Sequence, residues 1–154
     1  MLTVADTLSA DHVLLDLAAA SPAAAIDAVI RALRHDERVL DAAALNTALR
    51  VNPPCRVTAS AAFGICLPHA RTAAVSDMVM SAARLATEVR FEACDHPVRY
   101  LFCIAVPQAM AADYLRIAGA LMRIFTDAET EHALHTASTS TAFVQALTRL
   151  ECKL

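Results

Sequence analysis

The sequence predicts one layered α/β domain, and three observations support this prediction. Strand-like and helix-like segments are mixed along the whole chain, without an internal repeat or a linker. The best strand is 98–106, an apolar and aromatic run that Pro107 closes. The clearest helix begins at Ser21-Pro22, an N-cap residue followed by a first-turn proline. Apolar side chains then recur at i, i+3, i+4 and i+7, which is typical of an amphipathic helix.

Apolar runs and breaker residues set the expected elements in the first half of the chain. Residues 13–17, Val-Leu-Leu-Asp-Leu, predict a short strand. A second helix is expected over 41–49, and Asn52-Pro53-Pro54 ends it. The small and polar residues 55–63 predict a loop that leads into the apolar run 64–67.

The second half predicts further strands and then three helices. We expect a strand over 78–85 and a turn over 92–97. Apolar residues at helical spacing then predict helices over 111–125, 127–137 and 140–150.

Composition and charge exclude several function classes. Although 57% of the residues are hydrophobic, the apolar runs are much shorter than the ~18 to 20 residues that cross a bilayer. Residues 1–6 lack the basic segment and apolar core of a signal peptide. We therefore expect a cytoplasmic protein without membrane insertion. The net charge of -3 argues against nucleic acid as a partner, because phosphate binding needs a basic surface.

The cysteine and histidine patterns predict no metal site. The five cysteines are odd in number and contain no C-x-x-C pair, which argues against a disulfide framework and a structural zinc. Cys66 and His69 have ligand spacing, but a cysteine in an apolar run is expected to pack inward. His132 and His135 lie at i, i+3 on a polar helix, where two solvated histidines are the expected arrangement.

Residues 64–71, Gly-Ile-Cys-Leu-Pro-His-Ala-Arg, are the segment that points to a specific chemistry. Pro68 has a fixed φ and no amide hydrogen, so a strand is expected to stop there. His69 would then lie at the edge of the core, held firmly and yet reachable. The alternative interpretation from the residues alone is a capping histidine that hydrogen-bonds a nearby carbonyl.

Three segments carry a resemblance to a known family over nearly the whole chain. They are residues 8–17, residues 64–71, and residues 91–98 with the strand that follows. Together they resemble the IIA component of the bacterial phosphoenolpyruvate-dependent sugar phosphotransferase system, of the fructose/mannitol type, and within it the nitrogen-regulatory branch. The resemblance implies that residues 1–154 form one three-layer domain, a mixed β-sheet flanked by helices on both faces.

The resemblance also implies a phosphohistidine chemistry at His69. This residue would accept a phosphoryl group from a small phosphohistidine carrier protein, and the two states would control a target such as a transporter or kinase. Imidazole suits the task, because it is partly neutral near pH 7 and then has a lone pair that can attack phosphorus. No cofactor is implied.

Phosphoryl transfer also requires groups that stabilise the charge on the phosphoryl oxygens. The hydroxyl candidates are Thr58 and Ser60, which precede the motif. The charged candidates are Arg50, Arg56 and Arg71. For each of these five residues, an ordinary loop or surface role is the alternative.

The chain departs from the family pattern in three places. Residues 57–64 contain alanines where the family has a glycine-rich loop, and no glutamate follows Arg50. Residues 109–115 lack the second histidine that many members carry, so that only Asp113 or Tyr114 stands there as a substitute. Two other functions therefore stay open: a degenerate IIA-like binding module that is poorly phosphorylated or not phosphorylated, and a sugar-specific IIA subunit.

Overall fold

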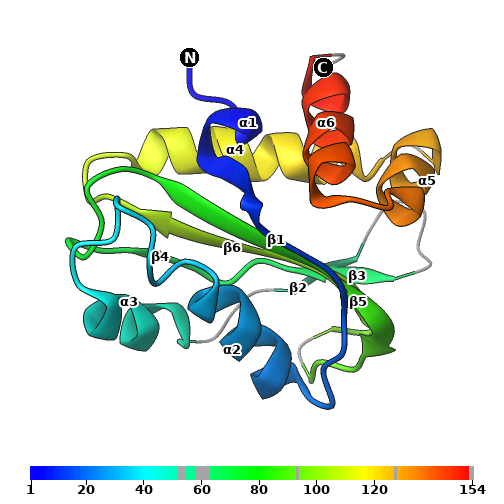
Figure 1. Ribbon diagram of the computed structural model, residues 1–154, viewed down its shortest axis with the longest axis horizontal. Helices are drawn as coiled ribbons and strands as arrows, with labels where there is room; N and C mark the ends of the chain where they lie inside the picture. Colours follow the sequence, from blue (N-terminus) through cyan, green and yellow to red (C-terminus); the bar gives the residue numbers. More distant parts are fainter. Residues whose placement is uncertain (52–54, 58–62, 93, 127, 153–154) are drawn as a thin grey trace.

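A mixed β-sheet lies between two layers of helices in the computed structural model (Figure 1). The structure describes residues 1–51, 55–57, 63–92, 94–126 and 128–152. Helices α1 (Val4–Thr7), α4 (Ala111–Ile124), α5 (Ala128–Thr136) and α6 (Ser140–Glu151) lie on one side of the sheet, and α2 (Pro22–Arg31) and α3 (Ala42–Leu49) lie on the other. The predicted α/β fold with helices on both faces is therefore confirmed.

The central strand of the sheet is β6 (Val98–Val106), as the sequence predicts. It pairs antiparallel with β5 (Val79–Val89) and parallel with β3 (Gly64–Cys66) and β4 (His69–Arg71). The outer strands are β1 (Leu8–Leu17), parallel to β5, and β2 (Cys55–Val57), antiparallel to β3. Every residue of β6 except Arg99 is buried, since helices cover both of its faces.

Side-chain hydroxyls cap the starts of two long helices, and the first of these caps, Ser21, is the one that the sequence predicts. The Ser21 hydroxyl accepts a hydrogen bond from the Ala24 amide at 3.1 Å, and the Thr139 hydroxyl accepts one from the Ala142 amide at 3.0 Å. None of the helices in the described ranges is both long and apolar enough to cross a membrane.

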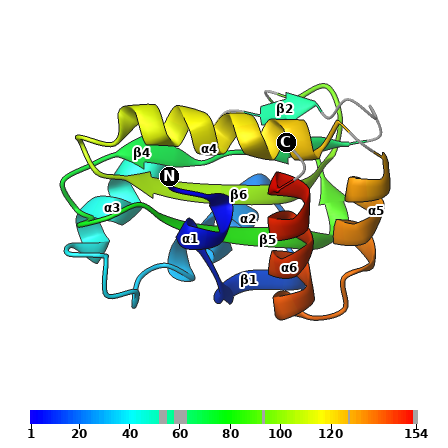
Figure 2. The same cartoon turned by 90° about the horizontal axis from the view of Figure 1, so that it is seen from above.

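Two hydrophobic cores lie on opposite faces of the sheet. Because side chains alternate along a strand, Tyr100, Phe102 and Ile104 of β6 enter the core beneath α4 and α6. Leu101 and Cys103 enter the core beneath α2 and α3. Seen from above, α4 lies along the direction of β6, and α6 runs across the strands (Figure 2). Helix α4 is thus the element that covers the sheet next to the motif of residues 64–71.

The structure corrects three boundaries. Residues 55–57, predicted as part of a loop, form β2, because β3 supplies hydrogen-bonding partners that no local pattern shows. The strand over 13–17 begins earlier, at Leu8, and the strand over 78–85 continues to Val89. Pairing with neighbouring strands extends both elements beyond their most apolar residues.

The expected stop at Pro68 is confirmed, since β3 ends at Cys66, but a new strand, β4, begins at the residue directly after the proline. Pro68 has no amide hydrogen, but its carbonyl accepts a hydrogen bond from the Ile104 amide at 2.8 Å. The chain therefore stays attached to β6 on both sides of the proline, and His69 is held by a strand instead of a loop.

Candidate functional site

His69 is the first residue of β4 and is half-buried. In the register of the sheet it lies opposite Ile104 of β6, and the Thr72 amide donates to the Val106 carbonyl at 2.8 Å. Leu67 belongs to the core beneath α4, and Ala70 packs against the core on the opposite face. These contacts hold the backbone of His69 in place while part of its side chain stays accessible.

The imidazole of His69 is oriented by a backbone carbonyl. Its Nδ1 lies 2.8 Å from the Leu67 oxygen. A carbonyl only accepts hydrogen bonds, so in the neutral ring the hydrogen is on Nδ1 and the lone pair is on Nε2. The carbonyl contact expected of a capping histidine is present, and the same contact leaves Nε2 as the nitrogen with a free lone pair.

Tyr114 of α4 lies flat against the His69 ring. The two ring centroids are 4.6 Å apart and the ring planes differ by 19°. Stacked aromatic pairs of this kind contribute about 0.5 to 1.5 kcal/mol beyond the area that they bury. The sequence places Tyr114 in the stretch that lacks the family's second histidine, and the structure brings that stretch to His69.

The five predicted phosphate-stabilising residues differ in their position relative to His69 and in how far the structure describes them. Arg71 ends β4 two residues after His69, so both side chains leave the strand on the same face, and Arg71 is exposed. Arg56 lies in β2, whose backbone alone is described. Thr58 and Ser60 fall outside the described residues.

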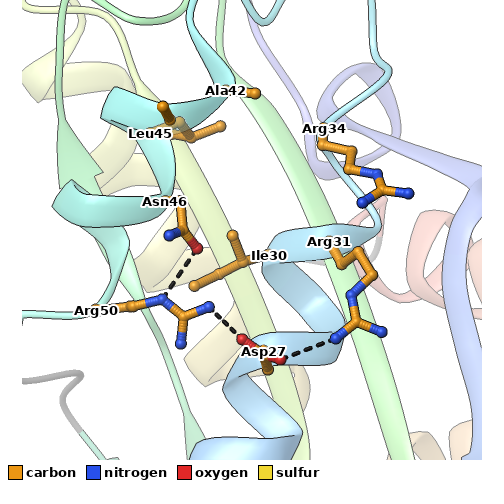
Figure 3. Close-up of a pocket in the computed structure, with 9 residues that line it drawn as sticks. Asp27, Ile30, Arg31, Arg34, Ala42, Leu45, Asn46 and Arg50 are labelled. Carbon is orange, nitrogen blue, oxygen red and sulfur yellow. Dashed lines mark hydrogen bonds and ion pairs between the residues drawn. The ribbon is translucent and has the colours of Figure 1, made fainter.

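Arg50 lies in a different part of the molecule, a groove between α2 and α3 (Figure 3). Its guanidinium donates to the Asn46 side-chain oxygen at 2.9 Å and forms an ion pair with Asp27. Asp27 also pairs with Arg31 at 2.8 Å. The hydrogen bond from Arg50 is the main cause that lowers the pKa of Asp27. The contacts that the structure shows for Arg50 thus tie two helices together.

This groove was not found from the sequence. It has a volume of about 270 Å³ and an apolar wall that includes Ile30 and Leu45. Asp27 and Arg50 are 23 residues apart on separate helices, so no local spacing indicates their contact. Within the described ranges, no group of three His, Cys, Asp or Glu side chains is placed to hold a metal ion.

Comparison with known families identifies the chain. Residues 6–150 match the family described as "Phosphoenolpyruvate-dependent sugar phosphotransferase system, EIIA 2". The chain belongs to this family. The fructose/mannitol-type IIA resemblance carried by residues 64–71 is therefore confirmed for nearly the whole chain.

A curated relative of this IIA chain is a fructose-specific EIIA component from Haloferax volcanii. The two are 45% identical over 67 residues, which is 43% of this chain and 44% of the relative. The chain thus aligns with less than half the length of that relative.

Solved structures share the fold of this IIA chain. The nitrogen regulatory protein IIA-Ntr from Neisseria meningitidis matches with a TM-score of 0.79 and 21% identity, over 94% of this chain and 98% of that one. IIA mannitol from Escherichia coli matches with a TM-score of 0.70 and 19% identity, over 92% and 99% of the two chains. Nitrogen-regulatory and sugar-specific proteins thus share this architecture, and the nitrogen-regulatory branch stays a prediction.

Proposed function

We propose that this chain is a phosphocarrier in which Nε2 of His69 accepts a phosphoryl group from a small phosphohistidine carrier protein. The observation that supports the proposal is the contact between Nδ1 and the Leu67 carbonyl, which leaves the lone pair on Nε2. His69 is half-buried, so part of the residue remains accessible to solvent.

The transfer is an exchange of one phosphorus–nitrogen bond for another. The Nε2 lone pair forms the new bond, the bond to the donor imidazole breaks, and its electron pair returns to the donor nitrogen. The His69 ring takes on positive charge as the new bond forms. The Leu67 carbonyl then accepts from a more acidic N–H, so this hydrogen bond strengthens toward the transition state.

The negative charge on the phosphoryl oxygens needs a separate partner. Arg71 is our first candidate, because it leaves β4 on the same face as His69. Thr58, Ser60 and Arg56 remain candidates from their position in the sequence. Arg50 is the weakest of the five, because its described contacts are with Asp27 and Asn46.

We further propose a regulatory role, in which the phosphorylated and free states bind a target such as a transporter or kinase differently in the cytoplasm. The resemblance of residues 8–17, 64–71 and 91–98 to the nitrogen-regulatory branch supports this role. The fold itself is common to both kinds of IIA protein. A sugar-specific role is the second candidate, and the 45% identity to a fructose-specific component supports it. In that role His69 would pass its phosphoryl group to a IIB protein. The mannitol IIA protein of Escherichia coli, for comparison, has been solved in complex with phosphorylated IIB.

The experiment that tests the phosphocarrier proposal is a phosphorylation assay on the intact protein. The chain is incubated with phosphoenolpyruvate, the first enzyme of the system and its small carrier. The mass of the intact protein is then measured by mass spectrometry. We expect an acid-labile gain of one phosphoryl group in the wild type and in His132→Ala, a control at an exposed histidine on α5. We expect no gain in His69→Ala.

Two outcomes would contradict the proposal in different ways. An unlabelled wild type, in the presence of a charged carrier, would favour the degenerate binding module over the phosphocarrier. A label that persists in His69→Ala would move the site to another residue. Transfer from the labelled chain to a fructose-type IIB protein would favour the sugar-specific role over the regulatory one.

A further inference from the structure

We propose that Tyr114 is a positioning residue for His69, a flat platform that holds the imidazole with Nε2 available for phosphoryl transfer. This inference deepens the proposed function and rests on it. The sequence motif of residues 64–71 does not contain Tyr114, which reaches the site from helix α4. The platform is the aromatic face of the ring, and the hydroxyl group has no part in the proposal.

Two restraints act on the His69 ring in different directions. The contact between Nδ1 and the Leu67 oxygen, at 2.8 Å, fixes the edge of the ring that faces the backbone. The Tyr114 ring, 4.6 Å away and inclined by 19°, covers one face of the imidazole. Rotation of the ring out of its plane would break the stack. A half-turn flip about χ2, which exchanges Nδ1 with Cδ2 and Nε2 with Cε1, would break the carbonyl contact. Together the two restraints select one rotamer and one tautomer.

Tyr114 is itself held in place by its helix. Its amide donates to the Met110 carbonyl at 3.0 Å, in the first turn of α4. Ile117 and Leu121 follow at i+3 and i+7 and are buried in the core beneath the helix. Leu115, the next residue along, is 69% exposed. Tyr114 therefore lies on the border between the buried stripe of α4 and solvent, where an anchored ring can reach a half-buried histidine.

The platform also acts differently on the two states of His69. The ring becomes cationic when Nε2 carries a phosphoryl group while Nδ1 keeps its hydrogen. The face of an aromatic ring attracts a cation, so Tyr114 stabilises the phosphorylated ring more than the neutral one. The second histidine of other family members can itself become charged, whereas the face of Tyr114 serves as an uncharged support.

The test uses Tyr114→Phe, which keeps the aromatic face, and Tyr114→Leu, which removes it. Leu115→Ala is the matched control, because Leu115 lies on the same helix and is exposed. Single-turnover transfer from the charged small carrier is followed at several concentrations of the chain, which separates the maximal rate from half-saturation. In parallel, nitrogen-15 shifts of the His69 ring in the unphosphorylated protein report its tautomer.

We expect Tyr114→Leu to lower the maximal transfer rate about 3- to 10-fold with little change in half-saturation. We also expect this variant to populate the second tautomer of His69. Tyr114→Phe should restore the rate and the tautomer of the wild type, and Leu115→Ala should leave the maximal rate and the tautomer unchanged.

Two results would overturn the proposal. One is a Tyr114→Leu protein whose tautomer is that of the wild type. The other is a Tyr114→Phe protein that loses as much as Tyr114→Leu, since the hydroxyl would then be the active group. If the wild type itself takes no phosphoryl group, the proposed function fails. The tautomer measurement still decides whether Tyr114 positions the ring, so the two failures are distinguishable.

Discussion

Replacing Asp36 by asparagine tests how much an ion-pair cluster stabilises the fold. Asp36 follows α2 and its side chain is 11% exposed. One carboxylate oxygen accepts from the Arg38 amide at 2.9 Å and from Nε at 2.8 Å, and the other accepts from Nη2 at 2.9 Å. Nε2 of His12, on the edge strand β1, lies 3.4 Å from the same carboxylate. The cluster thus connects the segment after α2 to the edge of the sheet.

The pKa of Asp36 gives the expected magnitude and its sign. The hydrogen bonds from the Arg38 side chain are the main cause that lowers this pKa from 3.8 to about 2. Such a drop corresponds to about 2 kcal/mol of unfolding free energy. Because the folded-state pKa is the lower one, this contribution is complete above about pH 5 and is lost as the pH falls through about 4 toward 2.

The assay is urea unfolding of the wild type and Asp36→Asn at a series of pH values. We expect the variant to be less stable by about 2 kcal/mol near pH 7, with the difference shrinking as the pH falls to about 3. Asp11→Asn, at an exposed residue of β1, is the control and should stay close to the wild type. A deficit that is the same near pH 7 and near pH 3 would contradict this expectation, because the charge of Asp36 would then not be its source.

Three further substitutions test the packing and the site. Arg84→Met should lower the unfolding free energy by about 3 kcal/mol in urea, because Nη1 donates to the buried Leu134 and Ala137 carbonyls at 2.9 and 2.7 Å. An unchanged urea midpoint would contradict this. Burial raises the pKa of Tyr100 to about 12, and within the described part of the chain its hydroxyl has no protein partner. Tyr100→Phe should therefore change the unfolding free energy in urea by less than about 1 kcal/mol. A larger loss of stability would reveal a hydrogen bond from the hydroxyl. Arg71→Ala should slow phosphorylation about 10-fold or more with an unchanged urea midpoint, since Arg71 is exposed; an unchanged rate would remove it from the site.

Much of the fold is predictable because its signals are local. The strand over 98–106 has the bounds that its apolar run and Pro107 indicate. Helix α2 begins at Ser21-Pro22, and α6 begins after Thr139, because a cap hydroxyl bonds an amide only three residues away. Strands β2 and β4 were not predicted, since three residues carry no periodicity and each strand exists through pairing with a distant neighbour.

For the candidate site, the amino-acid sequence alone was enough to single out His69 as the candidate phosphoacceptor and to indicate the family. Residues 64–71 single out His69, and the match over residues 6–150 confirms the family that this motif resembles. How the His69 ring is held became visible only in the folded structure. The carbonyl of Leu67 sets which nitrogen is free, and Tyr114 covers the ring from a distant helix. The folded structure also placed Arg50 with Asp27 in the groove between α2 and α3. The physical reason is that a motif specifies chemistry through neighbouring residues, whereas ring orientation and ion pairing depend on how helices pack on the sheet.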